Sequence, residues 1–324
     1  MSVPAVSVII PTYNRVPLLR AALDSVHRQT FCDYEVIVVD DGSTETVGEA
    51  VQAHPTAPRV IRQDRRGPAA ARNRGLKEAR AGTIAFLDSD DLWHPEKLAR
   101  FMEALGRDST VRIFYGPMSP IDSEGRPVPG RTKPCHGGRI TGQLFCSSFV
   151  HVPTVVCRRE LLDRAGGFDE SLSVCEDYDL WLRLSLHEPF GLLPEPLAWR
   201  RLHGDRLSKQ CMSRNLAIKA NVLRRFYEAA QFDGYLHSSV ARGRLARVCF
   251  VAARAALANG EYDRAVEFCR LSSSFGQARV RTLPILIRAI LAGAVRGSSS
   301  SSSCSPLARN LAPGATEEMS SRSQ

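Results

Sequence analysis

Three carboxylates, Asp88, Asp90 and Asp91, stand within four positions of one another, directly after the apolar run 83–87. An apolar run of this kind predicts a buried strand that carries the three acids at its C-terminal tip. Hard cations such as Mg²⁺ and Mn²⁺ bind carboxylate oxygens together with water and substrate phosphates. The spacing therefore predicts a Mn²⁺ or Mg²⁺ site that carries a phosphate ester. The alternative for the same letters is a solvated turn followed by a helix cap.

Two further polar clusters also follow apolar runs. The run 6–10 stops at Pro11, where we expect the strand to end, and Thr12 and Tyr13 follow. The run 34–39 leads into Asp40 and Asp41. Neither run alternates strictly between apolar and polar residues, as expected of strands covered on both faces in a parallel sheet. A segment with helical spacing follows the first run, so we expect βαβ units. Ligands bind outside the carboxyl ends of strands in such sheets, where all three clusters would meet.

Two segments carry groups suited to a nucleotide. Asp41 is an acceptor-only carboxylate that can take the imide N–H of a pyrimidine base, although a capping turn explains the same residues. The segment 67–75 passes from turn residues into a small-residue helix, whose N-terminus is suited to a diphosphate. Within it, Arg72 offers a planar fork that matches a phosphate or a base carbonyl.

A later segment places acids in the first turn of an amphipathic helix. Glu176 and Asp177 precede Leu180, Trp181 and Leu184, which we expect to face the core. Acids at a helix N-terminus can simply match the helix macrodipole. A carboxylate here can alternatively serve as a general base.

In order and spacing, six segments together resemble the family 2 glycosyltransferases of the GT-A type. The resemblance covers about residues 4–209 and implies a Rossmann-like, doubly wound and mostly parallel α/β sheet. The matching segments are 7–15, 40–43, 67–75, 86–93, 166–170 and 176–183.

The resemblance also implies roles for the donor side. Asp41 would hold the base, with Thr12 and Tyr13 beside it, and Arg72 would contact the nucleotide. Residues 88–90 would be the DxD motif, with Asp90 as the direct metal ligand and Asp88 as a ribose or water-mediated partner. Asp91 would take either role or cap the helix that follows Pro95.

On the acceptor side, the resemblance identifies Glu176 and Asp177 as the family's ED pair. Asp177 would remove the proton of the acceptor hydroxyl, and a single carboxylate opposite the leaving group implies direct displacement with inversion. The segment 198–208 resembles the closing loop of non-processive members. His203 in that loop is expected either to reach the metal or the diphosphate, or to be a surface residue.

The expected function is that of a metal-dependent, inverting, hexosyltransferase-like enzyme. It would move one sugar from a nucleotide-sugar donor, in the first place a UDP-sugar, to a hydroxyl of a glycan, a lipid-linked or a small-molecule acceptor. Cell-surface polysaccharide or glycoconjugate biosynthesis is the expected setting. The Gln/Arg-x-x-Arg-Trp segment of processive polymerases is missing after the ED pair, which favours single addition.

Two other function classes remain open. A non-catalytic sugar-nucleotide-binding protein would be a degenerate transferase, yet every expected carboxylate is present. A nucleotidyltransferase usually carries a glycine-rich first loop, whereas residues 11–15 contain no glycine.

The remainder of the chain, from residue 210, has a different composition. Residues 1–209 hold 27 Lys and Arg against 27 Asp and Glu, so the whole net charge of +9 falls in residues 210–324. We expect a basic helical region over 210–296 with helices near 214–230, 238–258, 262–274 and 283–295, and a disordered Ser-rich tail over 297–324. The basic helices are either a packed appendage with a solvated face or a peripheral contact with anionic lipid.

Composition also bears on the compartment. The nine cysteines show no metal-ligand spacing, which is typical of free thiols in a reducing cytoplasm. No signal peptide or membrane span is expected, since the chain leads straight into its first strand and its late apolar stretch is short. We therefore expect a cytoplasmic protein, either free or peripheral at the inner membrane face. Basic charge without a recognised motif does not indicate a nucleic-acid partner.

Overall fold

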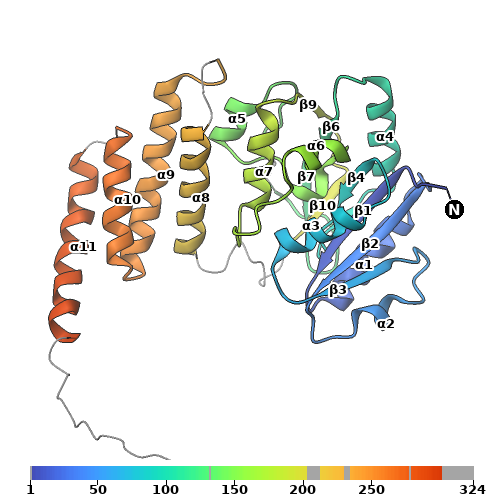
Figure 1. The fold of residues 1–324 in the computed structure, drawn as a ribbon, viewed down its shortest axis with the longest axis horizontal. Coiled ribbons are helices and arrows are strands. Elements are labelled where there is room, and N and C mark those ends of the chain that lie inside the picture. Colours follow the sequence, from blue (N-terminus) through green and yellow to red (C-terminus); the bar gives the residue numbers. More distant parts are fainter. Residues whose placement is uncertain (1, 131–132, 203–211, 230–233, 277–278, 301–324) are drawn as a thin grey trace, which may run out of the picture.

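The computed structural model describes residues 2–130, 133–202, 212–229, 234–276 and 279–300 (Figure 1). Its N-terminal half is built on a seven-stranded sheet with the order β3-β2-β1-β4-β8-β6-β9. The strands are β1 Val6–Thr12, β2 Tyr34–Asp41, β3 Arg59–Gln63, β4 Thr83–Phe86, β6 Ile113–Tyr115, β8 Val156–Arg158 and β9 Phe190–Leu192.

The sheet is mostly parallel, as predicted. β1 pairs in parallel with β2 and β4, and β2 pairs in parallel with β3. β8 is the exception, because it runs antiparallel to both β4 and β6. The carboxyl ends of β1, β2 and β4 therefore lie at one edge, and the segments that follow these strands meet there.

Helices cover both faces, which explains why the central strands β1, β2 and β4 carry buried apolar residues on both sides. Val8 and Ile10 of β1 pack in one core with α1 and α4, whereas Ile9 packs on the other side with α3 and α7. Alternation of side chains along a strand sends neighbours to opposite faces. The helices of this part are α1 Val16–His27, α2 Val47–Val51, α3 Pro68–Glu78, α4 Lys97–Arg107, α5 Thr141–Cys146, α6 Arg159–Arg164 and α7 Glu176–Ser185, with the 3-10 turn η1 Val152–Thr154.

Strand β1 continues through Pro11, where the sequence predicted its end. Pairing with β4 stops at Ile9, whose carbonyl accepts the N–H of Leu87. Backbone groups two residues apart point to the same side of a strand, so the missing N–H of Pro11 faces the side where that ladder has already ended. The proline thus costs no pairing and lets the strand carry Thr12 to the sheet edge.

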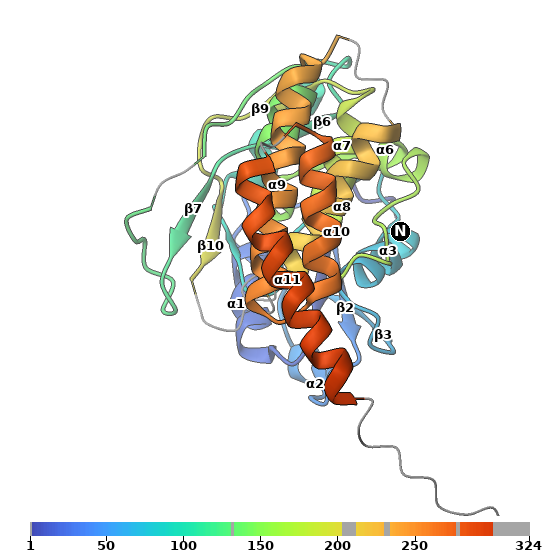
Figure 2. The same ribbon diagram turned by 90° about the vertical axis from the view of Figure 1, so that its left-hand side faces the viewer.

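A second, three-stranded sheet stands beside the first and has the order β5-β10-β7 (Figure 2). It is formed by β5 Leu92–Trp93, β7 Met118–Ile121 and β10 Ala198–Arg201. The prediction of a loop over 198–208 is wrong for residues 198–201, because β10 pairs with β7 and β5. Residues 203–208 lie outside the described part of the chain.

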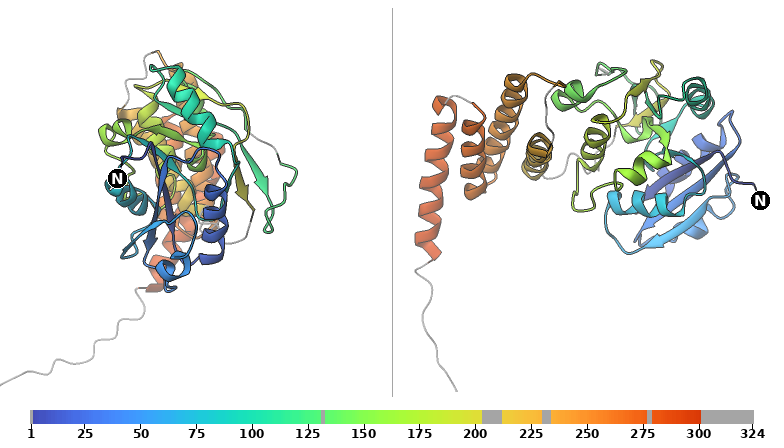
Figure 3. Two further views of the ribbon diagram at one scale, coloured as in Figure 1. Left: turned by 90° about the vertical axis from the view of Figure 1, so that its right-hand side faces the viewer. Right: turned by 45° about the horizontal axis from the view of Figure 1, so that its top comes forward.

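The C-terminal region is a row of helices next to the sheet domain, with α11 farthest from it (Figure 1; Figure 3). α8 Met212–Ala229, α9 Ser238–Ala258 and α10 Tyr262–Ser274 lie close to the ranges that the sequence predicts. α11 Arg279–Ser300 runs past the predicted boundary at residue 296, and residues 301–324 lie outside the described ranges. None of the described helices combines the length and the apolar character that a transmembrane span requires.

Candidate active site

The acids after β4 take three different orientations. Asp88 accepts a hydrogen bond from Arg72 at 2.8 Å, and Asp90 accepts one from Arg15 at 2.9 Å. The side chains of Asp88 and Asp90 keep 30% and 14% of their exposure. Burial raises the pKa of Asp88, and the nearby charge of Asp90 adds to the rise while Arg72 opposes it. These two carboxylates therefore lie close enough to influence one another at the sheet edge.

Asp91 turns away from this pair. Its side chain is buried and accepts the backbone N–H of Arg201 at 3.1 Å, so it ties the acidic loop to β10. The predicted capping role is wrong, because α4 begins at Lys97 with Glu96 at the N-cap and has no side-chain capping bond. Asp91 therefore holds the acidic loop in place, whereas Asp88 and Asp90 lie nearer the surface.

Asp41 is buried at the end of β2 and holds the loop that starts α3. It accepts hydrogen bonds from the side chain of Gln63 at 2.8 Å, from the backbone N–H of Arg66 at 2.9 Å and from that of Gly67 at 2.8 Å. A carboxylate offers about four lone-pair sites. One acceptor site on Asp41 therefore remains for a further donor.

Thr12 and Tyr13 lie beside this loop. The hydroxyl of Thr12 is buried without a hydrogen-bond partner among the described residues, which marks a polar group aimed at something the protein does not supply. Tyr13 is half-buried, and the guanidinium carbon of Arg65 lies 4.0 Å from the centroid of its ring. A flat aromatic face stacked on a cation closes this side of the sheet edge.

Arg72 lies behind the acidic loop and is buried. Its guanidinium donates to Glu176 at 2.7 Å and to Asp88 at 2.8 Å. Burial opposes the charge of Arg72, but the two carboxylates outweigh it and raise the pKa of Arg72 above its ordinary value. Both terminal nitrogens are thus paired with protein acids, so Arg72 supports the site from behind.

Glu176 and Asp177 open helix α7 from a strained turn. Cys175 at the N-cap has a φ of 64°, in the left-handed region that L-residues rarely adopt. Glu176 is buried against Arg72, whereas Asp177 is half-buried and accepts the N–H of Tyr178 at 2.7 Å. Burial and the charge of Glu176 raise the pKa of Asp177 to about 7. A carboxyl group with this pKa can take up and release a proton near neutral pH.

Leu180, Trp181 and Leu184 of the same helix are buried in the larger core, as predicted. They fix α7 against the sheet, so the acids of its first turn are held at the sheet edge.

The turn 166–170 connects the two halves of the site through Asn73 of α3. Asn73 accepts the N–H of Phe168 at 2.9 Å and donates to the carbonyl of Phe168 and to Glu170, each at 2.9 Å. Gly167 has a φ of +70°, and a Cβ there would lie 2.6 Å from the Asn73 side-chain oxygen. Only glycine fits this close approach. The helix that follows Asp41 therefore also positions the turn that leads to α7.

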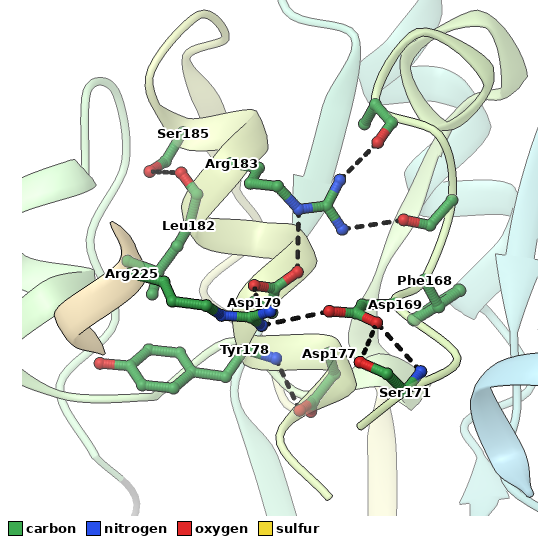
Figure 4. A network of polar contacts seen from close by, with 12 residues as sticks. Phe168, Asp169, Ser171, Asp177, Tyr178, Asp179, Leu182, Arg183, Ser185 and Arg225 are labelled. Carbon is green, nitrogen blue, oxygen red and sulfur yellow. Dashed lines mark hydrogen bonds and ion pairs between the residues drawn. The ribbon is translucent and has the colours of Figure 1, made fainter. Parts of the chain in front are cut away.

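Ion pairs fasten α7 to this turn and to α8 (Figure 4). Arg183 donates to Asp179 at 2.8 Å and to the carbonyl of Gly167 at 2.8 Å. Arg225 of α8 reaches Asp169 at 3.1 Å and approaches Asp179 at 3.7 Å. The C-terminal helices are thus joined to the element that carries Asp177.

The carboxylates of this site suit a divalent cation whose remaining coordination positions are filled by the substrate and by water. Across the described ranges, no three His, Cys, Asp or Glu side chains gather closely enough to hold a metal by themselves. Two carboxylates, Asp88 and Asp90, suit Mg²⁺ or Mn²⁺ when water and substrate phosphates supply the other oxygens. Each now faces an arginine, so binding of a cation would replace part of those ion pairs.

Some contributors were not identified from the sequence. Arg15, which pairs with Asp90, and Asn73 stand in motifs that the sequence singles out, but nothing in a motif tells which partner a side chain meets. His203 lies outside the described residues. A cavity of about 600 Å³ opens at the opposite, amino end of β4, beside Gly82, Arg112 and Arg158, and thus lies away from these groups.

Comparison with known proteins agrees with this geometry. The model of Glycosyl transferase family 2 matches residues 7–164. An uncharacterized glycosyltransferase of Haemophilus influenzae is 30% identical over 239 residues, which are 70% of this chain and 80% of that protein. One from Rickettsia bellii is 33% identical over 205 residues, 62% of this chain. This chain spans 29% of the length of that longer relative.

Two solved structures share the fold. S. aureus TarS 1–349 superposes with a TM-score of 0.62 at 19% identity, over 91% of this chain and 92% of that one. The mannosyltransferase PcManGT from Pyrobaculum calidifontis gives a TM-score of 0.57 at 21% identity, over 93% and 88% of the two chains. The predicted GT-A architecture with a helical C-terminal part is confirmed.

Proposed function

This chain belongs to glycosyl transferase family 2, and on that premise we propose that it transfers one sugar from a UDP-sugar to an acceptor hydroxyl with inversion. We assign the transfer to residues 4–209 and treat residues 210–296 as a helical appendage. Cell-surface polysaccharide or glycoconjugate biosynthesis is the proposed setting. The seven cysteines among the described residues are free thiols, which supports a reducing compartment such as the cytoplasm.

The observation that carries this proposal is the position of Arg72 between two carboxylates. One end of its guanidinium holds Asp88, on the loop proposed to face the leaving diphosphate. The other end holds Glu176, whose neighbour Asp177 is the proposed base. A single buried cation therefore fixes the spacing between the group that accepts a proton and the loop that meets the leaving group.

In the proposed reaction, the acceptor hydroxyl oxygen attacks the anomeric carbon from the side opposite the diphosphate. The bond from that carbon to the diphosphate oxygen breaks, and its electron pair leaves with the diphosphate. The carboxylate of Asp177 takes the hydroxyl proton, for which its pKa of about 7 is suited. One displacement at the carbon gives inversion.

When bound through Asp90 and Asp88, Mn²⁺ or Mg²⁺ supplies positive charge to the departing diphosphate. The PcManGT structure contains GDP-Man and Mn²⁺, a precedent for a metal in this fold.

The uracil preference rests on Asp41. With three donors already bound, its carboxylate can accept one more hydrogen bond. The imide of uracil, like that of thymine, offers a single N–H, whereas the Watson–Crick edge of guanine offers two donors side by side. TarS structures contain UDP and UDP-GlcNAc, which supports the same choice.

The test is a donor panel of UDP-, GDP- and dTDP-sugars with Mn²⁺. We expect saturation-transfer NMR to detect binding of at least one UDP-sugar, and release of UDP to depend on the metal. Absence of metal-dependent nucleoside diphosphate release from every donor would refute the enzymatic proposal.

A further inference from the structure

Four cationic side chains without a carboxylate partner of their own lie close to one another beside the first turn of α7, and two of them, Lys133 and Lys219, lie close enough to Asp177 to feel its charge. They are Lys133, Arg200, Lys219 and Arg244, here called the cationic rim. Within the described ranges, none of the four has a carboxylate oxygen within 4.0 Å. Arginines elsewhere near the site are paired, as Arg72 is with Glu176 and Arg183 with Asp179. The rim is therefore a local excess of positive charge beside the proposed base.

Two members of the rim come from the C-terminal helices. Lys219 of α8 places its ammonium nitrogen 5.6 Å from the centroid of the Tyr178 ring, and Tyr178 directly follows Asp177. Burial raises the pKa of the Tyr178 hydroxyl, and Arg244 of α9, which lies beside that hydroxyl, opposes the rise. The Nε atom of Arg244 is buried without a hydrogen-bond partner in the described structure.

The other two members approach from the sheet domain. Lys133 precedes α5 and donates to the carbonyl of Ser148, and Arg200 stands on β10. Burial lowers the pKa of Lys133, and repulsion from Arg200 and Arg244 lowers it further, while Asp177 opposes the shift. Burial together with Arg200 and Lys133 lowers the pKa of His151 to about 4. The members of the rim thus repel one another and any further cation near them.

An ordinary solvated face does not explain this arrangement. Arg200 and Lys133 keep much of their surface exposed, although the ammonium end of Lys133 is partly shielded from solvent. Lys219 and Arg244 are half-buried, where an uncompensated charge is costly. Ion pairs of Arg225 also hold α8 against the α7 region, so Lys219 stays beside the base. Fixed and partly buried cations without a carboxylate partner, as Lys219 and Arg244 are, form the arrangement that an anionic ligand completes.

We propose that the cationic rim binds a phosphate group of the acceptor, so that the enzyme glycosylates a hydroxyl close to a phosphate. This inference rests on the proposed function, because it names the acceptor class of the same site. The phosphate remains intact during transfer and serves only to position the hydroxyl. It also gives the basic helical region a role, since α8 and α9 supply half of the rim.

Binding of glycerol 3-phosphate tests the proposal, with glycerol as the neutral probe and with UDP and Mn²⁺ filling the donor site. Calorimetry on the full chain should show binding of glycerol 3-phosphate and none of glycerol. The double variant Lys219→Ala/Arg244→Ala should raise the Kd at least tenfold. The matched control Arg214→Ala/Arg254→Ala removes the same charge from exposed positions of α8 and α9 and should change the Kd less than twofold.

A charge-conserving variant distinguishes the loss of positive charge from misfolding of the protein. Lys219→Arg/Arg244→Lys should keep most of the affinity, whereas a merely structural role would make it as damaging as the alanine variant. Equal Kd values for all variants, or no binding of glycerol 3-phosphate to the wild type, would overturn the proposal. Lack of metal-dependent UDP release by the wild type would instead refute the proposed function, while the binding result would still report on the rim.

Vesicles separate an acceptor phosphate from a membrane surface. Phosphatidylglycerol and phosphatidylcholine vesicles are sedimented with the wild type and both alanine variants. Equal sedimentation of the two variants supports the acceptor proposal. Loss of phosphatidylglycerol binding in the rim variant alone, with unchanged affinity for glycerol 3-phosphate, would assign the rim to lipid and overturn it.

Discussion

The guanidinium of Arg72 donates to Glu176 across 2.7 Å and so joins helix α3 to the first residue of α7. The two residues lie 104 positions apart in the chain. Because the pair is buried, it sets where α7 begins relative to the loop that carries Asp88. This long-range ion pair therefore contributes directly to the geometry of the proposed site.

Arg72→Met should therefore be severely destabilising. It leaves Asp88 and Glu176 without their shared cation, and breaking a buried pair in this way costs about 3–5 kcal/mol. Urea unfolding measures the loss. Arg74→Met on the same helix removes an exposed arginine and should cost no more than about 1 kcal/mol. Similar losses for the two variants would show that Arg72 does not have this role.

The rate of transfer should fall as the pH drops below about 7, because Asp177 must be ionised to accept a proton and its pKa is raised to about 7. Glu176→Gln removes a negative charge that contributes to this rise, so the midpoint of the acidic limb should move to lower pH. Profiles of kcat against pH for both proteins check the direction. A midpoint that stays in place or rises would contradict the assignment of Asp177.

Asp177→Asn should stabilise the fold while it abolishes turnover. A carboxyl with a raised folded-state pKa holds its proton in the folded state up to higher pH, so its contribution to stability is lost as the pH rises from about 4 to about 7. An amide has no such loss. At pH 8 we expect a gain on the order of 4 kcal/mol over the wild type, because about three pKa units at about 1.4 kcal/mol each are involved, and a gain of only about 1–2 kcal/mol at pH 5. Thermal unfolding at the two pH values tests this, and an equal effect at both would refute it.

The acids after β4 should separate by function. Asp90→Ala should abolish metal-dependent turnover and cost no more than about 1 kcal/mol of stability, because it removes the ion pair with the half-buried Arg15. Asp91→Asn weakens the buried bond to the N–H of Arg201 and should cost about 1–2 kcal/mol of stability, with the concentration of Mn²⁺ for half-maximal rate nearly unchanged. Metal titrations and urea unfolding distinguish the two effects. A large change in the Mn²⁺ concentration for half-maximal rate in Asp91→Asn would contradict the assignment of metal binding to Asp90 and of a structural bond to Asp91.

The sheet was predictable because its signal is local. Apolar runs that end in polar clusters mark β1, β2 and β4, and parallel pairing brings their carboxyl ends to one edge. The predicted helices α8, α9 and α10 were close to those observed for a similar reason. Pro11 was misjudged as a strand end, since the sequence does not show that pairing with β4 stops at Ile9.

The site was predictable as a set of residues but not as a set of contacts. Asp91 resembles Asp90 in sequence, and only the pairing of β10 with β5 reveals that its carboxylate is buried. Arg72 was expected to face a nucleotide, yet Glu176 and Asp88 occupy its terminal nitrogens. These ion pairs depend on how α3 packs against α7, and the sequence of a single motif does not show that packing.

Release of nucleoside diphosphate from the preferred donor, measured side by side for wild type, Asp90→Ala and Asp177→Asn, tests the central claim most directly. We predict release by the wild type with Mn²⁺, loss of release after chelation, and no turnover by either variant in the presence of acceptor. Undiminished turnover by Asp177→Asn would contradict the claim that this carboxylate is the base of a metal-dependent sugar transfer.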